Sequence, residues 1–193
     1  MGCGPSGIDG WLNYDWGWLP LLSKVPILRR WLIRLGVLPE NYEVSWSAIR
    51  LVDIRKRLPL RDASVDYIYC SHVLEHFEEF ETIGVLKECY RVLKKKGVIR
   101  IVLPDLEKMV ENYKGAKQFN LEFFGYRKNE KSVINNFVRG HQWMYDKSLF
   151  LKIIGGVFDE AKIESFGVGK VPDLDRLDLV EHKSHSLYIE ATK

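Results

Sequence analysis

Polar side chains that could bind a ligand follow four segments with the pattern of β-strands. Asp15, Asp53, the pair Ser71-His72 and Asp105, which follows Pro104, lie at the ends of these segments. In a parallel sheet the carboxyl ends of the strands line one cleft, where ligands bind. One acid after a strand is more often a helix cap or a turn residue, but four such positions together favour a binding cleft.

A glycine-rich turn, MGCGPSG, occupies residues 1–7. Such a turn lets the backbone approach a nucleotide-like ligand, and it normally lies between a central strand and a helix. Here no strand pattern precedes it. The turn alone is therefore either a ligand loop that lacks its strand or a terminus rich in small residues.

Strand and helix patterns alternate along the chain. Strands are predicted at residues 12–14, 49–53, 67–70, 98–103, 161–166 and 186–192. Helices are predicted at 27–35, 80–94, 105–113 and 146–154, with Gly97 as the stop signal of the second and aspartates capping the last two. The alternation predicts an α/β fold with a mostly parallel sheet and helices on both of its faces.

Composition limits the remaining possibilities. The chain has 193 residues, of which 46% are hydrophobic, enough for the core of a single domain over residues 1–193. The net charge of +3 does not indicate a nucleic-acid partner, and none is expected. Cys3, Cys70 and Cys89 lack CxxC spacing, so they are expected to be reduced in a cytoplasmic protein, with no metal site. Charges interrupt the apolar stretch 18–38, so it should not span a bilayer.

Two sequence segments carry a family resemblance. LVDIRKRLPLRDASVDYIYCSHVLEHF at residues 51–77 and ECYRVLKKKG at 88–97 resemble class I S-adenosylmethionine-dependent methyltransferases of the type 11 group. The similarity extends from Gly2 to about Asp105 and resumes more weakly at 143–146 and in the C-terminal strands. The resemblance implies a Rossmann-like three-layer sandwich with an antiparallel last strand, and methyl transfer from S-adenosylmethionine.

The resemblance also implies which residues bind this cofactor. The loop Gly2-Cys3-Gly4 would pass the methionine and ribose without an obstructing side chain. Asp15 would accept both ribose hydroxyls.

The remaining positions of the implied cofactor site follow the next strands. Asp53 would accept the adenine amine while Ile54 packs on the ring, and Ser71 and His72 would lie beside the sulfonium. The Leu74-Glu75-His76 run marks the family and either contacts the site or orients the start of a helix.

Methyl transfer needs alignment of acceptor and sulfonium, and in some cases a base. His72, Asp105 and His141 are the candidate catalytic residues, with Tyr145 as a group that could orient the acceptor. His182 and His185 are expected to be exposed flanking residues.

Two regions lie outside the shared core. Residues 16–40 are expected to form a helical lid or cover, with a homodimer contact or a membrane-surface helix as alternatives and the membrane not favoured. Residues 114–145 are expected to roof the acceptor pocket, and their aromatic residues favour a small-molecule, sugar or lipid-linked acceptor.

The chain departs from the family pattern at its first, central strand, of which only Met1 is present. A truncated start, a strand supplied by another chain, and closure of the gap with a damaged cofactor site are the three explanations. We expect fewer than seven strands and an altered loop at residues 2–10. A non-catalytic binding or scaffold protein with impaired cofactor binding is therefore the alternative function.

Overall fold

The computed structural model describes residues 1–4, 7–38, 49–124 and 140–193. Its six described strands form two sheets. The first pairs β1 (Tyr14–Asp15) with β2 (Arg50–Leu51) in parallel. The second has the order β3-β4-β6-β5, with β3 at Val65–Ser71, β4 at Leu93–Pro104, β5 at Glu160–Glu164 and β6 at Ser186–Thr192. Strands β3 and β4 are parallel, whereas β6 is antiparallel to both of its neighbours.

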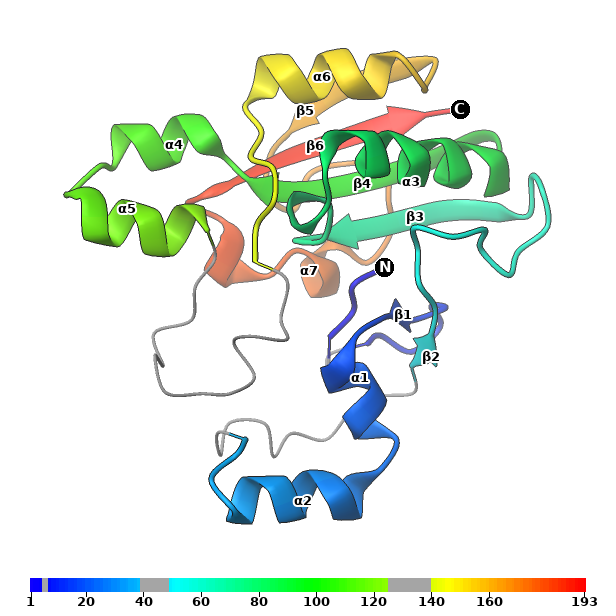
Figure 1. Cartoon of the computed structure of the whole chain (residues 1–193). Coiled ribbons are helices and arrows are strands. Elements are labelled where there is room, and N and C mark those ends of the chain that lie inside the picture. The colour runs from blue at the N-terminus through cyan, green and yellow to red at the C-terminus, as the bar shows by residue number, and fades with distance from the viewer. Residues whose placement is uncertain (5–6, 39–48, 125–139) are drawn as a thin grey trace.

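Helices lie on both faces of the four-stranded sheet, as predicted. The described helices are α1 (Trp18–Ser23), α2 (Pro26–Arg34), α3 (Glu79–Val92), α4 (Leu106–Glu111), α5 (Ala116–Phe123), α6 (Lys147–Gly155) and α7 (Leu174–Leu177), with short 3-10 helices η2 (Leu74–His76) and η4 (Val180–His182). Figure 1 shows α3 and α6 over one face, α7 on the other, and α1 with α2 standing away from the sheet. None of the described helices is long and apolar enough to cross a membrane.

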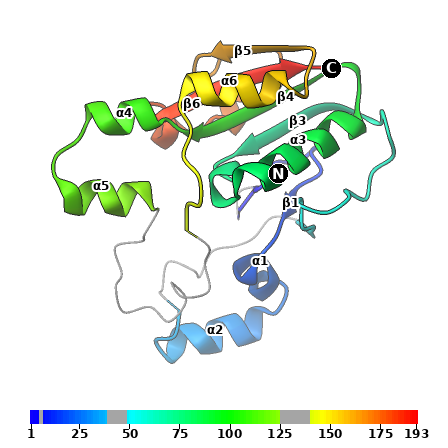
Figure 2. The same cartoon turned by 45° about the horizontal axis from the view of Figure 1, so that its top comes forward.

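Strand β4 is the centre of the core. Ile99, Ile101 and Leu103 are at most 1% exposed and belong to the hydrophobic cluster that includes residues of α3 and α6. On the opposite face Val98 packs with Val171 from the segment before α7. Figure 2 shows β4 between β3 and β6 beneath these helices. Burial on both faces explains why residues 98–103 are apolar on both sides of the strand, apart from Arg100, rather than alternating with polar residues.

The boundary between α3 and β4 differs from the prediction. Helix α3 ends at Val92, and the strand begins at Leu93, so Gly97 lies within β4 and does not stop the helix. Leu93 is fully buried and pairs with Val65, after which the ladder shifts so that Tyr67 pairs with Val98. Core packing of Leu93 thus favours extended backbone over the helical continuation predicted to residue 94.

The two sheets meet at the N-terminus of the chain. The ammonium group of Met1 donates to the Tyr69 carbonyl at 2.6 Å, and the Gly2 amide donates to the Tyr14 carbonyl at 2.9 Å. Residues 1 and 2 therefore link β3 to β1, and no described strand lies between these two strands. The expectation of fewer than seven strands is confirmed for the described residues. Of the loop at 2–10, residues 5 and 6 lie outside the described residues.

A buried ion pair holds the second face of the sheet. Arg100 of β4 is 0% exposed and donates to both carboxylate oxygens of Asp178, at 3.0 and 2.5 Å. It also donates to the carbonyls of Val168 and Ser165, and its guanidinium lies 3.5 Å from Glu190. Because removal of one partner leaves charges buried and uncompensated, this network fixes the segment 165–178 against β4.

We expect Arg100→Met to lower the free energy of unfolding by about 3–5 kcal/mol, because the carboxylates of Asp178 and Glu190 would stay buried without their cation. Urea denaturation followed by circular dichroism measures this change. Lys94→Met, on the same strand, is the matched control, since Lys94 makes a surface ion pair with Asp66 and its loss should leave the urea midpoint unchanged. An Arg100→Met variant as stable as the parent chain would contradict the stabilising role of the Arg100 ion pairs.

Candidate functional site

A cavity of about 1130 Å³ runs along the free edge of β3. Gly2 and Tyr14 line one side, Tyr67 and Tyr69 of β3 line the other, and Ser71, His72 and His182 lie at its carboxyl end. Because a central strand would occupy the space between β1 and β3, the cavity combines that space with the ligand edge of the sheet.

The glycine loop at the head of the cavity needs its small residues. Gly2 has a φ of +66°, and a Cβ there would lie 2.0 Å from a methyl carbon of Val73. The Gly4 amide donates to Asp15 Oδ2 at 2.6 Å, while the other carboxylate oxygen accepts from the Trp16 amide at 2.7 Å. Burial raises the pKa of Asp15. Burial and the nearby Asp15 carboxylate also raise the pKa of Cys3 to about 11, so this thiol is protonated at neutral pH.

The predicted adenine-binding residues lie beside the cavity rather than in its wall. Asp53 forms a bidentate pair with Arg55, at 2.9 Å for each contact, and this hydrogen bonding lowers the pKa of Asp53. Ile54 is 5% exposed and belongs to the core. Among the predicted cofactor positions, those that line the cavity are Gly2, Cys3, Gly4, Ser71 and His72, and those that do not are Asp15, Asp53 and Ile54.

His72 is held on several sides at the carboxyl end of β3. Its Nδ1 lies 3.3 Å from Glu75 Oε1, and its Nε2 lies 3.1 Å from the Ser186 hydroxyl. Its ring stacks on that of His182, with centroids 3.9 Å apart. The backbone of His72 has a φ of +51°, which side-chain-bearing residues rarely adopt. The prediction that His182 is an exposed flanking residue is therefore wrong, because His72 covers one side of its ring.

The five histidines of the chain form two groups that the contact between His72 and Glu75 joins. His72, His182 and His185 place one ligand atom each within 4.8 Å of one another, and Glu75, His76 and His141 do the same. Glu75 is 1% exposed, whereas His185 is exposed as predicted. No spacing rule connects these residues in the sequence, so only the fold reveals the cluster.

The other candidate residues have clear local roles. His141 Nδ1 lies 3.0 Å from the Phe123 carbonyl, and burial lowers the pKa of this histidine. Asp105 is 0% exposed and caps α4 as predicted, with its carboxylate accepting from the Glu107 amide at 3.2 Å. The Tyr145 hydroxyl is buried and donates to Thr82 at 3.0 Å. This bond gives Tyr145 a structural role in place of the predicted contact with an acceptor.

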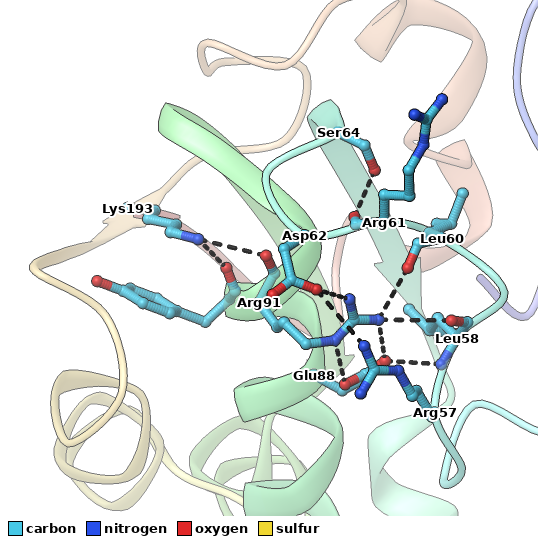
Figure 3. Close-up of polar contacts among 10 residues, drawn as sticks. Arg57, Leu58, Leu60, Arg61, Asp62, Ser64, Glu88, Arg91 and Lys193 are labelled. Carbon is cyan, nitrogen blue, oxygen red and sulfur yellow. Dashed lines mark hydrogen bonds and ion pairs between the residues drawn. The ribbon is translucent and has the colours of Figure 1, made fainter.

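Arg91 shapes the wall of the cavity near the amino end of β3. Figure 3 shows its guanidinium between Glu88 on α3 and the loop that carries Leu58, Leu60 and Asp62. Glu88 in turn accepts from the Leu58 amide at 2.7 Å. These contacts anchor residues 58–62 to α3, and residues 58–61 of that loop line the cavity. The run around Arg91 that matched the family pattern is thus explained by loop anchoring.

Comparison with known proteins identifies the fold. A family described as a methyltransferase domain matches residues 37–101. The whole chain aligns with an S-adenosylmethionine-dependent methyltransferase from Methanosarcina mazei at a TM-score of 0.54 and 14% identity, covering 89% of that protein. It also aligns over its whole length with a protein from Pyrococcus horikoshii at a TM-score of 0.53 and 20% identity, covering 79% of that chain.

No curated protein sequence matches the chain. The family match and the solved structures settle two predictions, the family resemblance and the fold. The predicted resemblance to class I type 11 methyltransferases is confirmed by the match over residues 37–101, and the chain has the Rossmann-like α/β fold of that class.

We expect stability to fall in acid because of His182. Burial and the neighbouring His72 and His185 lower the pKa of His182 to about 4, below the usual unfolded-state value of about 6.5. The unfolded chain therefore takes up this proton first, and the associated stability is lost as pH falls from about 7 through 4. Urea denaturation at a series of pH values measures the slope.

The variant His182→Gln should show a shallower slope over this range. Lys183→Gln is the matched control, since it changes an exposed neighbour and keeps the His182 imidazole, so it should leave the slope unchanged. An NMR titration in which the His182 imidazole has a pKa of 6.5 or above would contradict the expectation.

Proposed function

We propose that this chain is an S-adenosylmethionine-dependent methyltransferase acting on a small-molecule, sugar or glycolipid-type acceptor. The observation that supports it most is the meeting of the Gly2–Gly4 loop with Ser71 and His72 at one end of one cavity. The methyltransferase-domain match and the fold support the same reading.

The cofactor-binding roles combine the family resemblance with the cavity, which Gly2–Gly4 line and beyond whose wall Asp15 and Asp53 lie. Backbone at Gly2–Gly4 would contact the methionine and ribose, and the glycine at position 2 lets this loop pack directly on Val73. Asp15 would accept the ribose hydroxyls through the remaining lone pairs of oxygens that Gly4 and Trp16 already orient. Asp53, oriented by Arg55, would accept the adenine amine beside Ile54.

When bound, the cofactor supplies an electrophilic methyl group on a sulfonium. His72 is the first candidate for the base, because it lines the cavity, Glu75 lies at its Nδ1 and its Nε2 is hydrogen-bonded only to the Ser186 hydroxyl among the described residues. Nε2 would take the proton of an acceptor hydroxyl as the oxygen–methyl bond forms. His141 and Asp105 remain alternative bases, although the Asp105 carboxylate already caps α4.

The acceptor class rests on the segment 114–145. In its described part, Phe119 and Phe123 of α5 stack with centroids 5.5 Å apart, and Tyr113 lies edge-on to Phe119. Aromatic faces suit an apolar or sugar surface. Residues 16–40, helical at α1 and α2, would act as a cover or as a homodimer contact, and α2 has no buried residue.

A non-catalytic binding protein is the second candidate. The observation that favours it is the extent of the cavity. The cavity follows the length of β3, from Ser71 at its carboxyl end to Val65 and Asp66 at its amino end. Cofactor contacts at Gly2–Gly4 would then rest on a loop whose contact with β3 is the hydrogen bond of Met1, while Gly2, Cys3 and Gly4 bond to β1.

Calorimetry with S-adenosylhomocysteine tests cofactor binding. We expect a dissociation constant in the micromolar range, and at least tenfold weaker binding for Asp15→Asn, because a neutral amide accepts ribose hydroxyls less strongly than a carboxylate. Asp9→Asn is the control, since Asp9 is exposed on the same loop and should bind as the parent does. Binding weaker than about 1 mM, equivalent to about 4 kcal/mol, would favour the non-catalytic protein.

Methyl transfer to mixtures of hydroxyl-bearing metabolites, sugars and lipid-linked sugars tests the acceptor class. We expect His72→Gln to lower kcat by about 100-fold or more through loss of the base, with the dissociation constant for S-adenosylhomocysteine changed less than threefold. Lys183→Gln, near the same end of the sheet, should leave kcat unchanged. Methylation of proteins or nucleic acids alone would contradict the proposed acceptor.

A further inference from the structure

Glu75 is a buried carboxylate without a hydrogen-bond donor. Its side chain is 1% exposed, and neither oxygen has a hydrogen-bond partner among the described residues. The nearest cationic group is the His72 imidazole, whose Nδ1 lies 3.3 Å away and carries charge only when protonated. Because a buried carboxylate is costly without a compensating charge, the site favours a bound cation.

Two imidazoles stand beside this carboxylate. Glu75, His76 and His141 each place a ligand atom within 4.8 Å of the others. The rings of His76 and His141 are 5.1 Å apart at an angle of 64°. Bonds of 2.0–2.2 Å to a tetrahedral metal place ligand atoms about 3.4 Å apart, so rotation of side chains would close the group.

Backbone contacts hold the ligands in place. The His141 Nδ1 lies 3.0 Å from the Phe123 carbonyl, and a proton on Nδ1 leaves the Nε2 lone pair available, the arrangement usual for a metal-binding histidine. The amides of Gln142 and Trp143 both donate to the Glu75 carbonyl, at 2.7 and 3.2 Å. Segment 140–143 is therefore pinned to η2, and this keeps His141 beside Glu75.

We infer that Glu75, His76 and His141 form a binding site for a divalent transition metal, with zinc as the best match to two imidazoles and one carboxylate. Three protein ligands leave a fourth coordination position for water or another oxygen ligand. His72, whose Nδ1 lies 3.3 Å from Glu75 Oε1, would orient this carboxylate as an outer-shell partner.

The second histidine group fits a metal less well. His182 Nδ1 and His185 Nε2 lie 3.4 Å apart and can hydrogen-bond to each other, while His72 Nε2 is engaged by Ser186. The rings of His72 and His182 lie nearly parallel, at 28°, rather than converging on a point. This group contains no carboxylate. Metal binding by its three imidazoles is the competing outcome of the test.

Calorimetry with Zn²⁺ on the full chain, first stripped with a chelator, tests the site. We expect one equivalent with a dissociation constant below about 10 μM, near −7 kcal/mol. His141→Gln and Glu75→Gln should each weaken binding at least tenfold. His185→Asn is the matched control and should change the affinity less than twofold. Because Glu75 is buried, circular dichroism is used to check that Glu75→Gln folds. If Glu75→Gln does not fold, the affinity of His141→Gln for Zn²⁺ is the deciding measurement.

X-ray absorption of the Co²⁺-loaded chain gives an independent measurement. We expect two imidazoles and oxygen ligands in the parent chain, and one imidazole in His141→Gln. Zn²⁺ binding weaker than about 100 μM, a spectrum with three imidazoles, or a loss in His185→Asn as large as that in His141→Gln would overturn the inference. Because S-adenosylhomocysteine binding is measured on the stripped chain, failure of the metal site leaves the proposed methyltransferase separately testable.

Discussion

The pairing of β4 with β3 on one side and β6 on the other determines where the candidate groups lie. Parallel register with β3 brings the His72 amide to the Val102 carbonyl at 2.9 Å. Antiparallel register with β6 places Pro104 opposite Ser186. The ends of three chain segments thus converge at one edge of the sheet. This register is costly to change, because a shift of one residue would turn the buried Arg100 away from Asp178 and Glu190 and into the apolar face.

Patterns that act locally were predictable from the sequence. The apolar run at 98–103, the aspartate caps of α4 and α6, and the C-terminal strand were all placed correctly, because each depends on neighbouring residues. Strands β1 and β2 were predicted longer than their two residues. The 12–14 segment shifted to 14–15, since pairing between partners 36 residues apart sets its limits.

Contacts between segments far apart in the sequence could be found only in the structure. Arg100 appeared as one polar residue in an apolar strand, and its partners lie 65 to 90 residues later. The two histidine groups draw on residues at 72, 75, 76, 141, 182 and 185, so no short window of sequence could contain them. The expectation of no metal site considered the cysteines and their spacing, whereas the inferred ligands are a carboxylate and an imidazole from η2 and a second imidazole from the segment before α6. Assembly of such distant segments is not visible in the local patterns of the sequence.

The left-handed backbone at His72 has a consequence for how this protein could be altered. A residue with a Cβ in that conformation costs the fold about 1 kcal/mol or more relative to glycine. Glycine would relax the chain there, yet it would also remove the imidazole that lies between Glu75 and Ser186. Greater thermal robustness and an intact ligand edge thus make opposite demands on this one position, so a search for stabilised variants would tend to select against the proposed activity.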